Sequence, residues 1–155
     1  QEEKLDLGII GTTSSEADLE FIKLCQIQDI LVASNSYVES LNSKSINDIF
    51  TKGSFMFLEK PNATREFIDT YFTKQNLSVT PDIEASNMDF LIECAKIGLG
   101  ITSVIKDFLH TDLENKTLIE IPLEFPIPPR YIGVIYKNSS NLSIATKTII
   151  DFLRE

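Results

Sequence analysis

Small neutral polar side chains gather where the predicted strands and helices of this chain end. Two threonines follow an apolar run at Leu5–Ile10, and Asn62 and Asn87 stand before two helix-like segments. In an open α/β sheet, ligands lie beyond the carboxyl ends of strands, where the free amides of helix starts favour anions. Hydroxyl and amide groups at such positions can bind a carboxylate without adding charge. The candidate ligand-binding residues are Thr12, Thr13, Asn62, Thr64, Asn87, Thr102 and Ser103.

Ordinary helix capping is the alternative explanation for part of this set. Asn62, Thr64 and Asn87 stand at helix starts, where a side-chain oxygen accepts hydrogen bonds from first-turn amides. Capping alone would account for each of the three. The case for a ligand site therefore rests on the whole set falling at the ends of elements.

The sequence assembles no nucleophile, base or metal cluster. His110 is the only histidine, and its surroundings, LHTDLEN, are typical of a solvated loop. The carboxylates are scattered, and none has metal-ligand spacing with His or Cys. The pair Gly98 and Gly100 lacks the third glycine of a dinucleotide fingerprint, because Ser103 holds that position and the pair follows a helix. We therefore expect no catalytic residue, no bound metal and no cofactor.

Charge and composition narrow the possible partners. The 155 residues carry 14 basic and 23 acidic side chains, for a formal net charge of −9. Affinity for nucleic acids comes largely from Lys and Arg, so the chain alone is predicted to bind them poorly. No apolar run approaches the roughly 20 residues that span a bilayer. We therefore expect no contact with membranes. The two cysteines, Cys25 and Cys94, are far apart in the sequence and suit free thiols in a cytoplasmic protein.

The elements that must position the candidate residues alternate between strand-like and helix-like patterns. This alternation predicts an α/β protein with a largely parallel sheet, in one domain or two small lobes. Strands are predicted at Leu5–Ile10, Lys23–Asn35, Ser54–Glu59, Val79–Ile83, Gly100–Val104, Thr117–Leu123 and Arg130–Lys137, and helices at Asn62–Gln75, Met88–Ile97 and Leu142–Leu153.

The stretch AKIGLGITSVI, at Ala95–Ile105, predicts a helix that stops and turns into a strand. Gly98 is expected just past the helix with a positive φ, which glycine adopts without strain. Gly100 is expected to let the backbone pass close to a neighbouring element, so that the amides near Thr102 and Ser103 face the ligand. On this interpretation valine at position 98 costs several times more stability than alanine at position 100.

Four segments, in this order, resemble the effector-binding domain of LysR-type transcriptional regulators. They are LDLGII at Leu5–Ile10, ATREFIDTYF at Ala63–Phe72, GLGITSVI at Gly98–Ile105 and LSIATKTIIDFL at Leu142–Leu153. The resemblance covers nearly the whole chain. Two positions depart from the family pattern: Lys106 stands where proline is usual, and Ile149 stands where phenylalanine is common.

The resemblance implies a two-lobed fold of the periplasmic-binding-protein type 2. The family's winged helix-turn-helix, linker helix and first effector-domain elements would precede Gln1, so the first lobe is expected to be incomplete. Residues 1–50 and 128–155 would form that lobe, and residues 54–123 the second. The crossing segments would lie near 50–54 and 122–130.

The resemblance also implies a function: sensing a small anionic metabolite between two lobes. Thr64, Thr102 and Ser103 would border that cleft. Homodimers or tetramers would form through Thr64–Gln75 and Val79–Ile83, and DNA would be contacted only by the absent N-terminal domain. Two alternatives remain at this point, a free-standing solute-binding protein of the periplasmic type and a small α/β enzyme. An upstream helix-turn-helix would remove the first, and turnover of a ligand would support the second.

Overall fold

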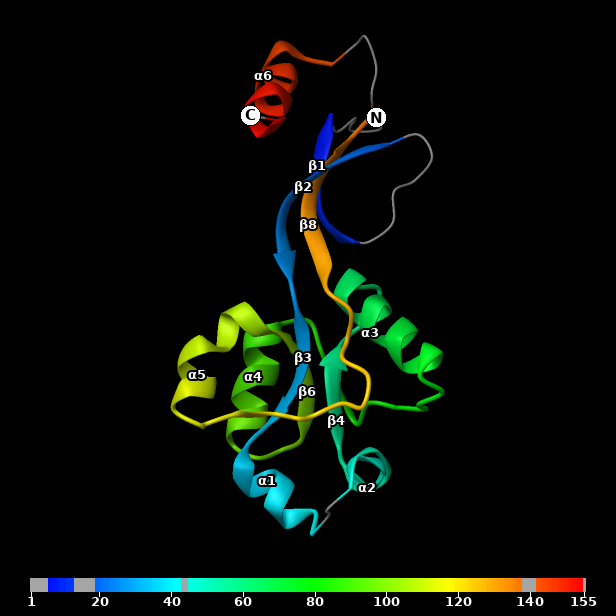
Figure 1. Cartoon of the computed structure of the whole chain (residues 1–155), viewed down its shortest axis with the longest axis vertical. Helices are drawn as coiled ribbons and strands as arrows, with labels where there is room; N and C mark the ends of the chain where they lie inside the picture. Colours follow the sequence, from blue (N-terminus) through cyan, green and yellow to red (C-terminus); the bar gives the residue numbers. More distant parts are fainter. Residues whose placement is uncertain (1–5, 13–18, 43–44, 138–141, 155) are drawn as a thin grey trace. The chain divides into compact units, whose positions relative to one another are not determined.

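The computed structural model describes residues 6–12, 19–42, 45–137 and 142–154. The chain divides into two compact units, one built from Gln1–Ile27 and Pro129–Glu155 and the other from Gln28–Pro128 (Figure 1). The first crossing was expected near 50–54 and lies instead between residues 27 and 28. The reason is that the strand beginning at Asp29 pairs inside the second unit. The return crossing, at 128–129, falls within the expected range.

Unit 1 (Gln1–Ile27 and Pro129–Glu155) contains a three-stranded antiparallel sheet. Strand β8 (Arg130–Tyr136) lies in the middle, between β1 (Leu7–Thr12) and β2 (Glu20–Ile27). Leu7 and Glu20 both pair with Tyr136, so the two outer strands share one partner. Cys25 is exposed on β2, beside an irregularity in the register.

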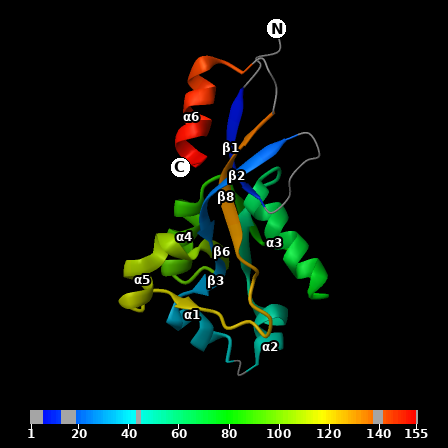
Figure 2. The ribbon, with the colours of Figure 1, turned by 45° about the horizontal axis from the view of Figure 1, so that its top comes forward.

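Helix α6 (Ile144–Arg154) belongs to unit 1 and is hydrogen-bonded at its start to Asp6, just before β1, and at its end to residues of β2 and β8. At its start, the Asp6 carboxylate accepts a hydrogen bond from the Thr146 hydroxyl at 3.0 Å. At its end, Arg154 donates to the Glu20 carboxylate at 2.8 Å and also bonds the Tyr136 hydroxyl. Figure 2 shows α6 beside the strands of this unit.

Unit 2 (Gln28–Pro128) holds a five-stranded sheet in the order β5-β4-β6-β3-β7. Strand β4 is parallel to β5 and β6, whereas β3 is antiparallel to β6 and β7. The expectation of a largely parallel sheet is therefore wrong in both units. Two parallel neighbours must be joined by a crossover connection, usually a helix. In unit 2 only β5 and β6 are reached through such a helix, and these are the two strands parallel to β4. The strands are β3 (Asp29–Ala33), β4 (Phe55–Leu58), β5 (Ile83–Ala85), β6 (Ile101–Ile105) and β7 (Ile119–Glu120).

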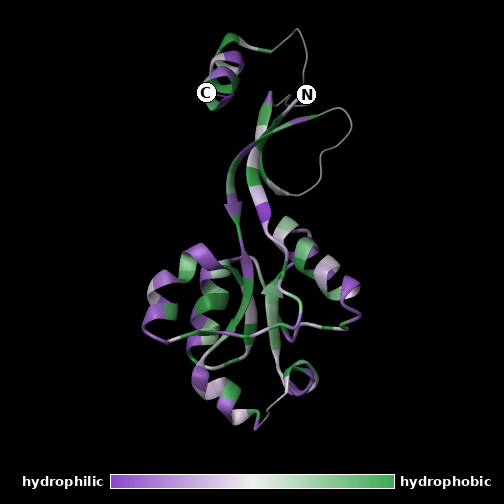
Figure 3. Cartoon of the chain, viewed as in Figure 1, coloured by the Kyte–Doolittle hydropathy of each residue, from purple (hydrophilic) through white to green (hydrophobic). Residues whose placement is uncertain are grey.

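Helices cover both faces of this sheet, and for that reason its central strands are apolar without alternation. In β3, Ile30 and Val32 pack on one face, while Leu31 and Ala33 pack on the other. The first face is covered by α4 (Met88–Lys96), the 3-10 turn η1 (Lys106–Leu109) and α5 (His110–Glu114). The second is covered by α1 (Asn35–Ser40), α2 (Ile46–Lys52) and α3 (Ala63–Lys74). Figure 3 shows hydrophobic residues along much of α4 and β6.

Both glycines of the GLG stretch behave as expected. Gly98 follows α4 with φ +81°, and the Leu99 amide donates to the Cys94 carbonyl at 3.0 Å to close the helix. At Gly100 the backbone passes so close to Ser54 that a β-carbon would stand 2.6 Å from the Ser54 carbonyl oxygen. The predicted strand at Val79–Ile83 is displaced, since β5 begins only at Ile83. The strand at Thr117–Leu123 shrinks to Ile119–Glu120.

Other expectations concern isolated residues. His110 is exposed, as expected, but it begins α5 rather than lying in a loop. Cys94 is buried on α4. Within the described ranges, no three His, Cys, Asp or Glu side chains are grouped so that they can hold a metal ion. None of the helices described combines the length and the apolar character needed to cross a bilayer.

Candidate functional site

Two neighbouring parallel strands of unit 2 are each followed by a helix with an asparagine at its start. Strand β4 leads to Asn62 and α3, and β5 leads to Asn87 and α4. Because Leu58 pairs with Ala85, the two strands end side by side. Strand β6, which is parallel to β4, ends at Ile105 on the same edge. We call this edge, defined by Leu58, Ala85 and Ile105, the carboxyl edge.

The two asparagines cap their helices in the same way. The Asn62 side-chain oxygen accepts from the amides of Thr64 and Arg65, at 2.9 and 3.2 Å. The Asn87 oxygen accepts from the amides of Asp89 and Phe90, at 2.7 and 3.4 Å. Capping therefore explains both side-chain oxygens. It leaves each asparagine with an NH₂ group, which is a donor and cannot take part in this type of cap.

Thr64 lies in the first turn of α3, as predicted, and its side chain is half-buried. A hydroxyl at this position stands next to the capped amides of the helix start. Asn62, Thr64 and Asn87 therefore all lie at the carboxyl edge. The structure brings these three candidates to neighbouring helix starts.

Thr102 and Ser103 lie elsewhere, within strand β6. Thr102 pairs with Val32 and Met56, and Ser103 pairs with Leu31, so their backbones belong to the sheet. Successive side chains of a strand point to opposite faces. Thr102 therefore faces the α4 side and Ser103 the side of α2 and α3, and their exposed fractions are 0% and 5%. The structure does not bring these two side chains together or expose their amides at the carboxyl edge.

The remaining two candidates belong to unit 1. Thr12 is the last residue of β1, where its backbone pairs with Tyr131. Thr13 lies outside the described residues.

A buried arginine, to which the sequence alone assigns no role, secures the start of α3. Arg65 is 6% exposed and donates to the Leu58 carbonyl at 2.8 Å and to Asp69 at 2.9 Å. Its guanidinium also bonds the Glu84 carboxylate of β5. Burial lowers the pKa of Arg65, but the bonds to Glu84 and Asp69 outweigh it, so the pKa lies above the usual value. The only local signal was the acidic residue four positions later on the same helix.

The lysines near the carboxyl edge are also paired with carboxylates. Lys60 lies 2.7 Å from Asp69, and Lys106 lies 2.8 Å from Glu120. Together with the Arg65 network, these ion pairs compensate all three cations. An anion at this edge would therefore depend on neutral N–H and O–H donors rather than on a spare positive charge.

The chain also leaves unit 2 at the carboxyl edge. Asp29, at the start of β3, pairs with Ile105, and the Lys106 amide donates to the Gln28 carbonyl at 2.8 Å. The Gln28 side chain donates to the Ile127 carbonyl at 2.6 Å, which holds the outgoing and returning segments together. The helix starts and both crossings therefore share one edge of the sheet.

Comparison with known proteins assigns the family. The family described as LysR substrate binding domain matches residues 1–155. The chain belongs to this family. The resemblance deduced from four segments is thereby confirmed, and so is the α/β fold of the periplasmic-binding-protein type 2. This membership favours a regulator over a free-standing solute-binding protein.

Two solved regulatory domains share the fold. The effector binding domain of QuiR in complex with shikimate aligns with a TM-score of 0.75 and 21% identity, covering 97% of this chain and 71% of that one. The CcmR regulatory domain of Synechocystis PCC 6803, in complex with 2-PG, aligns with a TM-score of 0.76 and 21% identity, covering 96% and 71%.

A curated transcriptional activator is similar in sequence. The HTH-type transcriptional activator CmpR of Synechocystis sp. is 23% identical over 149 residues. The alignment covers 96% of this chain and 49% of CmpR, so the chain spans about half the length of this relative.

Proposed function

We propose that this chain senses a small anionic metabolite at the carboxyl edge of unit 2, as the effector-binding part of a LysR-type transcriptional regulator. DNA binding would reside in a separate helix-turn-helix segment, which agrees with the net charge of −9 on this chain. No reaction is proposed. The observation that carries the proposal is the pair of asparagine-capped helix starts on adjacent parallel strands.

Helix starts suit an anion because their amide groups and the helix dipole both favour negative charge. At the carboxyl edge, Thr64 adds a hydroxyl, and Asn62 and Asn87 add side-chain NH₂ donors. The QuiR structure contains shikimate, a carboxylate, and a ligand of that class fits these donors. These neutral donors would select a carboxylate ligand by geometry, since the neighbouring cations are already paired with carboxylate side chains.

Ligand binding changes a regulator only if the ligand binds one arrangement of the protein better than another. Both crossings leave unit 2 at the carboxyl edge, so a ligand there would lie next to the two segments that join the units. This proximity gives a small molecule a direct means of favouring one arrangement.

We further propose that association between copies uses α3 and the segment Val79–Ile83. Strand β5 stands at one end of the sheet order, and residues 77–82 before it belong to no helix or strand. An edge of this kind offers unpaired backbone groups to a second chain. Homodimers and higher oligomers of the regulator would be built on this surface.

The ligand site can be tested with asparagine-to-aspartate variants. Aspartate caps a helix as well as asparagine does, so Asn62→Asp and Asn87→Asp should fold normally. Each replaces an NH₂ donor by a negative charge. In calorimetric titrations with shikimate, other small carboxylates and inorganic phosphate, these variants should lower the affinity of any anion that binds the parent by about tenfold or more.

Asn47→Asp is the matched control. This residue is exposed on α2, near the amino end of β4 and thus at the opposite edge of the sheet. Anion affinity should be unchanged in this variant. Unchanged affinity in both edge variants as well would contradict the proposed site.

A further inference from the structure

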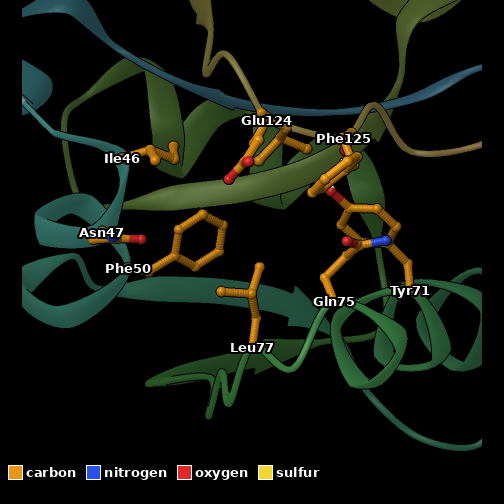
Figure 4. A pocket seen from close by; sticks show the side chains of 9 residues that line it. Ile46, Asn47, Phe50, Tyr71, Gln75, Leu77, Glu124 and Phe125 are labelled. Atoms are coloured by element: carbon orange, nitrogen blue, oxygen red, sulfur yellow. Dashed lines mark hydrogen bonds between the residues drawn. The ribbon is translucent and has the colours of Figure 1, made fainter.

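A pocket lies in unit 2 away from the carboxyl edge, and its chemistry differs from that of the edge. It opens between α2, the last turn of α3 and residues 123–125 of the returning segment (Figure 4). Helix α2 leads into the amino end of β4, so this pocket is at the opposite end of the strands from Asn62 and Asn87. Ile46, Phe50 and Leu77 supply apolar walls.

Aromatic rings make one wall of this pocket continuous with the protein core. Phe50 stacks on Phe55 with ring centroids 5.4 Å apart and meets the edge of Phe72 at 5.9 Å. Tyr71 donates its hydroxyl to the Phe125 carbonyl at 2.5 Å, which ties α3 to the returning segment. Figure 4 shows the Phe50 ring, Leu77 and the Phe125 ring around the same space. An aromatic ring of a ligand could therefore pack against the rings of this wall.

The charge on the pocket lining is negative. Among the nine lining residues, Glu124 is the one carboxylate, and no lysine or arginine is present. The other polar side chains that line it, Asn47 and Gln75, are neutral amides. An anionic ligand would meet repulsion from Glu124 and no compensating cation. A cation would be attracted both by Glu124 and by the aromatic ring faces.

We propose that this pocket binds a small aromatic cation, with its ring against Phe50 and Tyr71 and its ammonium group at Glu124. The site is independent of the anion site at the carboxyl edge and takes a ligand of opposite charge. Its occupant would join α2 and α3 to the returning segment, which continues from Phe125 to the crossing at Pro128. Binding would therefore hold that segment against the helices.

Benzylammonium, benzyl alcohol and benzoate are suitable probes, because they share one ring and differ in charge. Each can be titrated into the isotopically labelled chain while amide chemical shifts are recorded. Benzylammonium should give saturable shifts at Phe50, Leu77 and Phe125. Its affinity should exceed that of benzyl alcohol by about two- to fivefold, which corresponds to the usual contribution of an exposed ion pair. Benzoate should bind most weakly.

Two variants test the assignment of roles. Glu124→Gln should remove most of the preference for benzylammonium over benzyl alcohol, whereas Glu66→Gln, which changes an exposed carboxylate in the first turn of α3, should preserve it. Asn47→Trp, at an exposed position of the lining, should block all three probes.

Several results would overturn the proposal. These are equal affinities for benzoate and benzylammonium, shifts confined to residues outside the pocket, or no saturable shift at all. If Asn47→Trp instead altered the sedimentation of the chain and left probe binding intact, the pocket would be a contact between copies rather than a ligand site.

Discussion

Gly100 lies against the Ser54 carbonyl, so closely that a β-carbon at position 100 would stand 2.6 Å from its oxygen. The same carbonyl accepts a hydrogen bond from the Ile101 amide at 2.9 Å, which fixes the contact. Neither backbone segment can retreat without breaking the junction of β4 and β6. Because of this contact, any side chain at position 100 costs more stability than the sequence alone indicated.

We therefore expect Gly100→Ala to destabilise unit 2 by about 1–3 kcal/mol, as overpacking does in a well-packed core. Gly98→Ala has space, since the nearest atom to its β-carbon is the Ser34 hydroxyl oxygen at 3.4 Å, but it strains a positive φ. That strain costs about 1–2 kcal/mol. Urea unfolding of both variants measures the two costs. A negligible loss for Gly100→Ala would show that the backbone moves apart easily.

Replacing the buried Arg65 tests how the start of α3 is held. Arg65→Met removes the ion-pair partner of Glu84, leaves Asp69 with Lys60 alone and frees the Leu58 carbonyl. Loss of a buried ion pair costs about 3–5 kcal/mol, and the partial exposure of both carboxylates reduces the expected cost to about 2 kcal/mol. Denaturant unfolding gives the value directly.

The control for Arg65 is Lys60→Met, which removes an ion pair to the same Asp69. The Lys60 side chain is well exposed, so we expect a loss of less than about 1 kcal/mol. Equal losses in the two variants would mean that the Arg65 network does not secure the helix start.

Asp6 should make the stability of unit 1 depend on pH. Hydrogen bonds from the Ser143 and Thr146 side chains lower the pKa of this carboxyl below its usual value of 3.8. A lowered folded-state pKa contributes stability above the unfolded-state value, and this contribution is lost as the pH falls towards the folded-state value. Between about pH 5 and about pH 3, the stability of the parent should therefore decline, and Asp6→Asn should make this decline less steep. Unfolding midpoints across that range check this, and an identical slope in the variant would contradict it.

Thr102→Val separates a structural from a binding role for the buried hydroxyl. Its oxygen has no hydrogen-bond partner in the described part of the chain, so valine, of equal shape, should leave stability unchanged or raise it by up to about 1 kcal/mol. If Thr102 contacts the effector, the same variant should instead lose anion affinity. Unfolding and titration of one variant therefore test both roles.

The sequence predicts best those elements in which apolar residues recur at a regular helical spacing. Helices α3, α4 and α6 lie within about two residues of the predicted ranges, because their apolar faces repeat along the chain. The strand expected at Val79–Ile83 moved for a reason distant in sequence. Asp82 accepts hydrogen bonds from the Ser54 hydroxyl and the Phe55 amide, so it turns towards the start of β4 before β5 begins.

Strand direction and unit boundaries could not be predicted. An apolar run buried on both faces has no feature that distinguishes a parallel from an antiparallel neighbour, and β3 proved antiparallel to β6. Only Gln28 separates β2 from β3, so no turn or proline marks the passage between units. The range near 50–54, where the resemblance implied a crossing, is instead the end of α2, which Gly53 caps.

For the site, sequence identified the helix starts but not the strand interior. Asn62 and Asn87 are typical capping residues before apolar helices, and the structure places both as caps. Thr102 and Ser103 looked equivalent because both follow the glycines. Only the sheet shows that they face opposite sides. The role of Arg65 depends on Glu84 and Leu58, which no local pattern connects to it.

The two units also differ in how their residues are distributed along the chain, and this difference sets an order of assembly during synthesis. Unit 2 is continuous from residue 28 to residue 128. Strands β1 and β2 pair only with β8 in the described part of the chain, more than a hundred residues after β1. On the ribosome, β1 and β2 must therefore wait for β8 while unit 2 emerges and folds. Completion of unit 1 is the last step, and a nascent chain released before β8 would hold a folded unit 2 with two strands lacking their partner.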